Sequence, residues 1–189
     1  MHEQIICAGF GGQGIMLMGK LLAQTGMKEG YNVTWMPSYG AEVRGGTAHS
    51  MVHIARERIA APTVSAPTVC IVMNKPSLTK FIDRVKNGGI LIINTSMAGE
   101  LPERKGIKII KLPLTKLALE VGSIKAANMV AIGAFVKLTK LFSLKSVTES
   151  LDEVLPAKEE IISVNKKAIK LGYDLVNTDR QGLKTDKHG

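Results

Sequence analysis

The chain has 189 residues, of which 45% are hydrophobic and 22% charged, and this composition is typical of one globular domain rather than of a disordered protein. Its longest apolar run, from Met129 to Val136, is far shorter than the roughly 20 residues of a membrane-spanning helix, and its first residues lack the basic and apolar pattern of a secretory signal, so neither is expected. The net charge of +9 comes mostly from lysines after residue 103, but aromatic residues make up only 4%, which favours a solvated or partner-facing lysine surface over one that binds nucleic acid.

The first half of the sequence alternates short apolar runs with amphipathic stretches. Strands are predicted at residues 4–8, 31–36, 48–55, 68–73, 90–94 and 108–112, and helices at residues 13–28 and 76–86. Pro37 is expected to stop the second strand, and the side chains of the third strand alternate between its two faces. Strands that alternate with helices predict an α/β fold whose mainly parallel sheet is flanked by helices.

The second half of the sequence is predicted to be helical. Helices are expected at residues 115–121, 126–141, 144–154 and 158–176, with Ser146 as the cap of the third. Residues 126–141 begin apolar nearly all round and should be buried, whereas residues 158–176 carry a single apolar stripe. No linker divides the chain, so residues 1–178 are expected to form a single domain, followed by a loose tail at residues 179–189.

A glycine-rich turn, Gly9-Phe10-Gly11-Gly12-Gln13-Gly14, joins the first predicted strand to the first predicted helix. In this context the GxGxxG pattern allows a tight turn, a close approach of backbone N–H groups to a phosphate, and close packing of helix on strand. Dinucleotide binding also requires an acidic residue at the tip of the second strand, and residues 35–38 offer none. Dinucleotide binding is therefore disfavoured. Two other interpretations of the turn stay open: it packs the strand on the helix, or it binds a phosphate or a partner chain.

The segment Ser38-Tyr39-Gly40-Ala41-Glu42-Val43-Arg44-Gly45-Gly46 follows the second predicted strand, at the edge of the sheet where ligands usually bind. Its glycines free the backbone to present side chains. Arg44 carries a planar guanidinium that suits a carboxylate or a phosphate. Two interpretations stay open for Arg44: contact with a partner chain or an anionic ligand, and an internal pair with Glu42 that ties the loop.

The remaining polar and sulfur-containing candidates predict no catalysis. Asn128 lies on an apolar helix and needs a hydrogen-bond partner, so a capping or loop-tying role is expected. His49 and His53 lie about 13 Å apart along one strand, too far to share a metal ion. Cys7 and Cys70 are expected to be buried free thiols in a reducing cytoplasm, and they are too few for an iron–sulfur cluster. The sequence therefore indicates a chain that binds and positions, with no catalytic residue and no metal site.

Three segments together resemble one protein family. Residues 9–15 (GFGGQGI), 38–46 (SYGAEVRGG) and 128–134 (NMVAIGA) are similar, in this order, to the gamma subunit of 2-oxoacid:ferredoxin oxidoreductases. The resemblance runs from Gln4 to Tyr173 and is strongest to the 2-oxoglutarate branch, because pyruvate-branch chains tend to carry phenylalanine in place of Tyr39.

The resemblance implies a Rossmann-like domain that packs against an alpha chain and helps to bind coenzyme A. Enzymes of this family decarboxylate a 2-oxoacid with thiamine diphosphate, transfer the acyl group to coenzyme A and pass the electrons to ferredoxin. The alpha and beta chains hold the thiamine cofactor, and beta or delta chains hold iron–sulfur clusters, so this chain is expected to hold no cofactor itself. The residues expected at a ligand or partner contact are Gly9, Gly11, Gly12, Gln13, Gly14, Ser38, Tyr39, Glu42, Arg44, Gly45, Gly46 and Asn128.

Two other classes of protein stay open. One is a free-standing nucleotide-binding enzyme built on the glycine-rich turn. The other is a basic nucleic-acid-binding module built on the lysine-rich second half of the chain. The resemblance favours neither, and it implies contact with protein partners rather than with nucleic acid or a membrane.

Overall fold

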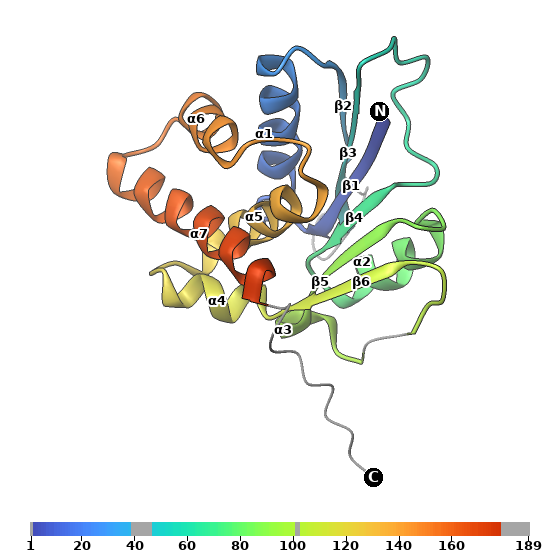
Figure 1. Ribbon diagram of the computed structural model, residues 1–189. Helices are drawn as coiled ribbons and strands as arrows, with labels where there is room; N and C mark the ends of the chain where they lie inside the picture. Colours follow the sequence, from blue (N-terminus) through green and yellow to red (C-terminus); the bar gives the residue numbers. More distant parts are fainter. Residues whose placement is uncertain (1, 39–46, 101–102, 179–189) are drawn as a thin grey trace.

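A six-stranded sheet forms the centre of the computed structural model, which describes residues 2–38, 47–100 and 103–178 (Figure 1). The strands follow the order β2-β3-β1-β4-β5-β6 across the sheet. Their bounds are His2–Phe10 for β1, Asn32–Ser38 for β2, Thr47–Ala55 for β3, Val69–Val72 for β4, Ile90–Asn94 for β5 and Lys108–Leu112 for β6. The inner strand β4 is buried along its whole length, which explains why its sequence is a continuous apolar run.

The sheet is mixed. β1, β4, β5 and β6 run parallel, as predicted, whereas β3 is antiparallel to both of its neighbours, β1 and β2. Only residues 39–46 separate β2 from β3, and a parallel crossover needs about a dozen residues or more, so these two strands must pair antiparallel. β3 therefore lies between β1 and β2, which places β2 about 10 Å from β1.

Helices cover both faces of the sheet (Figure 1). One face carries α1 (Ile15–Lys28), α4 (Leu114–Glu120), α5 (Ala127–Thr139), α6 (Leu144–Val154) and α7 (Glu159–Thr178). The other face carries α2 (Lys75–Phe81), the 3-10 turn η1 (Ile82–Arg84) and the short helix α3 (Thr95–Ala98). Alternate residues of β1 separate the two cores, because Ile5 and Cys7 face the larger helical layer while Ile6 and Ala8 face the smaller one.

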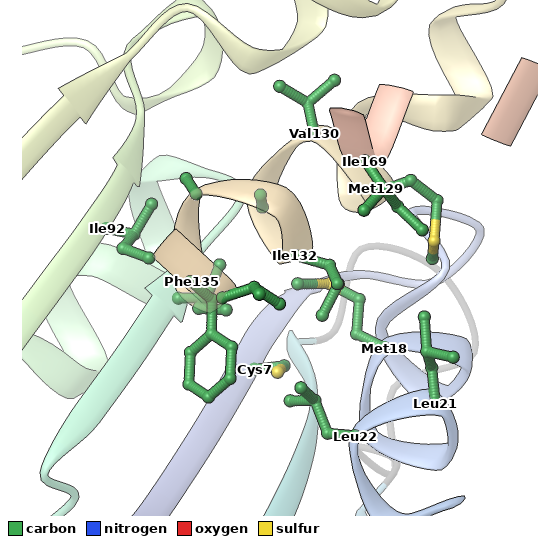
Figure 2. Close-up of a cluster of buried hydrophobic side chains, with 14 of the residues drawn as sticks. Cys7, Met18, Leu21, Leu22, Ile92, Met129, Val130, Ile132, Phe135 and Ile169 are labelled. Atoms are coloured by element: carbon green, nitrogen blue, oxygen red, sulfur yellow. The ribbon is translucent and has the colours of Figure 1, made fainter. Parts of the chain in front are cut away.

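α5 is the buried centre of the larger layer, as its apolar sequence predicts. Figure 2 shows Met129, Ile132 and Phe135 of α5 packed among Met18, Leu21 and Leu22 of α1. α5 and α7 cross closely because glycines stand at the crossing. A methyl group on Gly133 would overlap the carbonyl oxygen of Ile169, and a methyl group on Gly172 would overlap that of Val130. No larger residue fits at either position unless the two helices separate.

Several predicted boundaries are wrong. β2 continues through Pro37 to Ser38, because an edge strand has one side without a partner strand and tolerates the missing N–H. Ser143 rather than Ser146 caps α6, since the Ser143 Oγ accepts a hydrogen bond from the Ser146 N–H at 3.0 Å. The helix predicted at residues 76–86 is α2 followed by η1, and the sequence did not predict α3.

Two further expectations concern the end of the chain and membranes. The tail expected at residues 179–189 lies outside the described residues. Within the residues that the structure describes, no helix combines the length and the apolar character needed to cross a membrane.

Candidate functional site

The glycine-rich turn lies at the edge of the sheet where β1 ends. It runs from Phe10, the last residue of β1, to Gly14, which directly precedes α1. The φ angles of Gly12 and Gly14 are 89° and 71°, in the left-handed region that residues other than glycine rarely adopt. The Gln13 N–H donates a hydrogen bond to the Phe10 carbonyl at 3.2 Å and closes the turn. The motif therefore has glycine where the backbone requires it.

Gln13 ties this turn to the neighbouring strand β4. Its Oε1 accepts hydrogen bonds from the Phe10 N–H at 2.7 Å and from the Asn74 Nδ2 at 3.1 Å. Asn74 is buried beyond the end of β4 and also caps α2 by accepting from the Ser77 N–H at 2.9 Å. Gly9 leaves room for this arrangement, because a methyl group there would lie 2.6 Å from the Gln13 Oε1. Gly9 and the Gln13 side chain are thus built into the turn.

Asn128 connects the turn to α5. It lies in the first turn of that helix and is 2% exposed. Its Nδ2 donates to the Gly14 carbonyl oxygen at 3.3 Å, and its Oδ1 accepts from the Met129 N–H at 2.9 Å, which confirms the predicted loop-tying role. A methyl group on Gly14 would overlap the Asn128 amide nitrogen. The third glycine of the motif therefore packs against α5, and the prediction that it packs helix on strand is wrong.

Two hollows adjoin the turn, and both are lined by Gly12 and Lys125. The larger, of about 500 Å³, lies between α1, α7 and the 3-10 turn η2 (Ile124–Ala126), and its apolar wall includes Leu17, Leu155 and Val164. The smaller, of about 180 Å³, lies beside Gln13 and is also lined by Met73 and Thr115. The glycine-rich turn is thus the shared border of an apolar groove and a smaller pocket.

The electrostatics of this edge suit an anion. α1 begins at the larger hollow with no side-chain cap and no acidic residue in its first turn, so the positive end of its dipole is uncompensated there. α5 begins there too without an acidic residue in its first turn, but its Ala127 N–H donates to the Ile124 carbonyl and its Met129 N–H donates to the Asn128 Oδ1. Lys125 is exposed and forms no ion pair with any carboxylate of the described residues. Among the described residues, Glu160 of α7 is the one acidic residue that lines the larger hollow. Free backbone N–H groups beside a lysine are a typical binding site for a phosphate.

Three residues of this edge, Asn74, Asn94 and Lys125, were not predicted from the sequence. Asn94, at the end of β5, is buried and donates to the Met73 carbonyl at 3.2 Å and to the Thr115 Oγ1 at 2.9 Å. Asn74 and Asn94 each directly follow an apolar run. A polar residue at the carboxyl end of a predicted strand is typical of a ligand-binding edge, and this pattern could have identified both. Lys125 has no such signal, because only the packing of α5 brings it to the turn.

The second sequence motif begins at the same edge of the sheet. Ser38 ends β2, opposite His49 of β3. Tyr39, Glu42, Arg44, Gly45 and Gly46 lie outside the described residues. Since β3 separates β2 from β1, the tip of β2 is not beside the glycine-rich turn, unlike the second strand of a dinucleotide-binding domain.

The described histidines and cysteines line neither hollow. The His53 Nδ1 lies 3.1 Å from the His2 Nε2, and burial lowers the pKa of His53. Cys7 and Cys70 are buried free thiols on opposite faces of the sheet, as predicted, and burial raises the pKa of Cys7 to about 12. Across residues 2–38, 47–100 and 103–178, no three His, Cys, Asp or Glu side chains gather to hold a metal ion.

Comparison with known proteins gives a consistent result. The model of the family described as pyruvate ferredoxin/flavodoxin oxidoreductase matches residues 4–175. The ketoisovalerate oxidoreductase subunit VorA of Methanothermobacter marburgensis is 36% identical over 177 residues, which are 93% of this chain and 37% of that protein. The 2-oxoglutarate synthase subunit KorC of the same organism is 33% identical over 183 residues, which are 93% of this chain and 97% of that protein.

Solved structures share the fold. The gamma subunit of a keto/oxoacid ferredoxin oxidoreductase from Geobacter sulfurreducens PCA has a TM-score of 0.79 and 26% identity, over 91% of this chain and 96% of that one. The 2-oxoglutarate:ferredoxin oxidoreductase from Magnetococcus marinus, with 2-oxoglutarate, coenzyme A and succinyl-CoA bound, has a TM-score of 0.84 and 26% identity, over 94% of this chain and 31% of that one. The chain spans little more than a third of the length of the VorA relatives, at 37% and 36%.

Proposed function

The chain belongs to the pyruvate ferredoxin/flavodoxin oxidoreductase family, and we propose that it is the gamma subunit of a 2-oxoacid:ferredoxin oxidoreductase that acts on 2-oxoglutarate or a related 2-oxoacid. This enzyme converts the 2-oxoacid and coenzyme A to the acyl-CoA and carbon dioxide, and ferredoxin receives the electrons. Its other chains are alpha, beta and, in some enzymes, delta subunits, and the complex works in the cytoplasm. The names of the relatives, which are subunits of 2-oxoglutarate synthase and ketoisovalerate oxidoreductase, support this assignment.

The observation that carries the role of this chain is the anion-suited edge at Gly12 and Lys125. Coenzyme A combines phosphates with a long pantetheine arm that ends in a thiol. The uncapped start of α1 and the Lys125 ammonium suit the phosphates, and the apolar wall of the larger hollow suits the arm. Bound there, coenzyme A would supply the thiol that accepts the acyl group. Gly12 and Lys125 would hold the molecule, and Asn128 and Gln13 would keep the turn in shape.

Thiamine diphosphate chemistry and electron transfer belong to the partner chains. An iron–sulfur cluster usually needs about four thiolates, whereas Cys7 and Cys70 are buried on opposite faces of the sheet. Among the described residues that line the two hollows, Glu160 is the one carboxylate. We assign binding and positioning to this chain, and the names of the relatives, each a subunit of a larger enzyme, support that role.

Reconstitution tests the proposed function. The partner chains, purified with and without this chain, are supplied with 2-oxoglutarate, coenzyme A and a viologen dye. We expect dye reduction from the complete mixture, and none from this chain alone. Turnover by the isolated chain, or full activity of the partner chains without it, would refute the proposal. Micromolar binding of NAD or NADP by the isolated chain would instead support a free-standing nucleotide-binding enzyme.

A further inference from the structure

Three large hydrophobic side chains that are exposed to solvent line the two hollows. Met97 and Ile124 line the smaller hollow and Ile161 lines the larger one. They are 42%, 54% and 49% exposed, although each is a side chain that folding usually buries. They come from α3, η2 and α7, three elements far apart in the sequence. We call these three side chains the apolar rim.

The fold of this chain does not account for the apolar rim. The Met97 Sδ accepts a hydrogen bond from the Gln13 Nε2 at 3.4 Å, which holds Met97 beside the turn but leaves it 42% exposed. Among the described residues, the other exposed large side chains, Met27, Trp35 and Leu119, line neither hollow. Single exposed hydrophobic residues are ordinary, whereas a group of them around a binding site indicates an interface. The apolar rim therefore marks a surface that another molecule covers.

Charge at the apolar rim indicates a protein rather than a polyanion. Lys125 and Glu160 both line the larger hollow, and both are exposed. Nucleic acid is attracted by surfaces on which lysine and arginine dominate. The lysine-lined hollow of this chain lies elsewhere, between α6 and α7, and within the described part of the chain three of its four lysines form ion pairs with carboxylates: Lys145, Lys166 and Lys170, but not Lys167. An apolar patch with charges of both signs is typical of a protein–protein contact.

The lengths of the relatives indicate which protein covers the apolar rim. The matched region is 37% of the VorA relative and 31% of the Magnetococcus marinus chain, so in both proteins this fold is continuous with a much longer stretch of polypeptide. In the KorC relative the match takes up 97% of the chain, so the companion region there has to be a separate subunit. Regions that are fused in one relative and separate in another are expected to pack together in both.

We propose that Met97, Ile124 and Ile161 dock against the partner subunit that corresponds to the rest of those longer polypeptides. The partner then closes over both hollows, and a ligand at Gly12 and Lys125 lies between two chains. This inference rests on the proposed function and adds the place where the partner sits. It also implies that neither chain alone binds the ligand with full strength, because each supplies only one wall of the site.

Charge substitutions in the apolar rim test the inference. Ile124→Asp and Ile161→Asp each place a carboxylate in the contact, and Met27→Asp, at a position that is 56% exposed on α1, is the matched control. Each full-length variant is titrated into the purified partner subunit by calorimetry, and its melting temperature is measured alone. We expect the two rim variants to bind about tenfold more weakly or worse, and Met27→Asp to bind like the original chain. All three should keep the original melting temperature, because the substituted side chains are exposed.

The outcomes separate this inference from the proposed function. If both rim variants bind the partner as tightly as the original chain does, the inference is wrong, while the proposed function stands. If the original chain binds no partner subunit, both are wrong. If the original chain forms a dimer that Ile124→Asp dissociates without affecting the partner, the apolar rim joins two copies of this chain and the inference is again wrong.

Discussion

Replacing Gly14 with alanine tests how the glycine-rich turn is held against α5. Two effects should add. A Cβ in the left-handed conformation, at a φ of 71°, costs about 1–2 kcal/mol. The same Cβ overlaps the amide nitrogen of Asn128, whose side chain is 2% exposed and has little room to move, and such overpacking costs about 1–3 kcal/mol. We therefore expect Gly14→Ala to lower the free energy of unfolding by about 2–5 kcal/mol.

Gly12→Ala is the matched control, because it isolates the backbone effect. Gly12 has a φ of 89°, and a methyl group there would meet no described atom within 4 Å. It should lower the free energy of unfolding by only about 1–2 kcal/mol. Asn128→Ala removes the side chain that Gly14→Ala would strike, so the double variant should be less destabilised than the sum of the two single variants, by about 1–3 kcal/mol.

Urea unfolding of the original chain and the four variants measures these differences from the midpoints at a common slope. Two results would refute the reasoning. One is a Gly14→Ala chain no less stable than Gly12→Ala. The other is a double variant whose loss equals the sum of the single losses within about 0.5 kcal/mol, because residues in direct contact should not be additive.

Three further predictions concern the core. Gly133→Ala should lower the free energy of unfolding by up to about 2 kcal/mol, because the overlap with the Ile169 carbonyl outweighs the gain of about 1 kcal/mol in helix propensity; a stabilised variant in urea unfolding would contradict the close crossing. Burial raises the pKa of Cys7 to about 12 and also raises the pKa of Cys70. A thiol reagent at pH 8 should therefore label neither cysteine in the folded chain and both after denaturation. Rapid labelling of the folded chain would contradict the burial of these thiols. Burial lowers the pKa of His49 below its ordinary value of 6.5, so at low pH the unfolded chain binds more protons than the folded chain. The free energy of unfolding should therefore decrease as the pH falls below about 6.5. His49→Gln should weaken this pH dependence, and an unchanged pH dependence in the variant would contradict the role of His49.

Much of the fold follows from local patterns in the sequence. The apolar runs of β1, β4 and β5 predict buried strands, and the stripe of α7 predicts a helix with one covered face, because burial on one or both faces sets the spacing of apolar residues. The antiparallel pairing of β2 with β3 cannot be predicted from the spacing of apolar residues. Pairing direction depends on the length of the connection and on which edge is free, so Pro37 looks like a strand end although it lies within an edge strand.

The candidate site was predictable only where a single segment builds it. The glycine-rich turn carries its own signal, since Gly12 and Gly14 adopt φ angles that favour glycine. Asn128 was singled out because a polar side chain on an apolar helix needs a partner, although the sequence does not say that the partner is Gly14. Lys125 comes within reach of Gly12 only through tertiary packing, and an exposed lysine in a lysine-rich half does not differ from its neighbours in sequence.

The proposed coenzyme A site is tested most directly by the kinetics of the assembled enzyme with Lys125→Ala. A lost charge-assisted hydrogen bond costs about 1.5–3 kcal/mol, so the KM for coenzyme A should rise about tenfold or more. The KM for 2-oxoglutarate should stay as it is. Lys116→Ala is the matched control, because Lys116 is an exposed lysine of α4 that lines neither hollow. An unchanged KM for coenzyme A in Lys125→Ala, or an equal rise in Lys116→Ala, would contradict the assignment of this edge to coenzyme A.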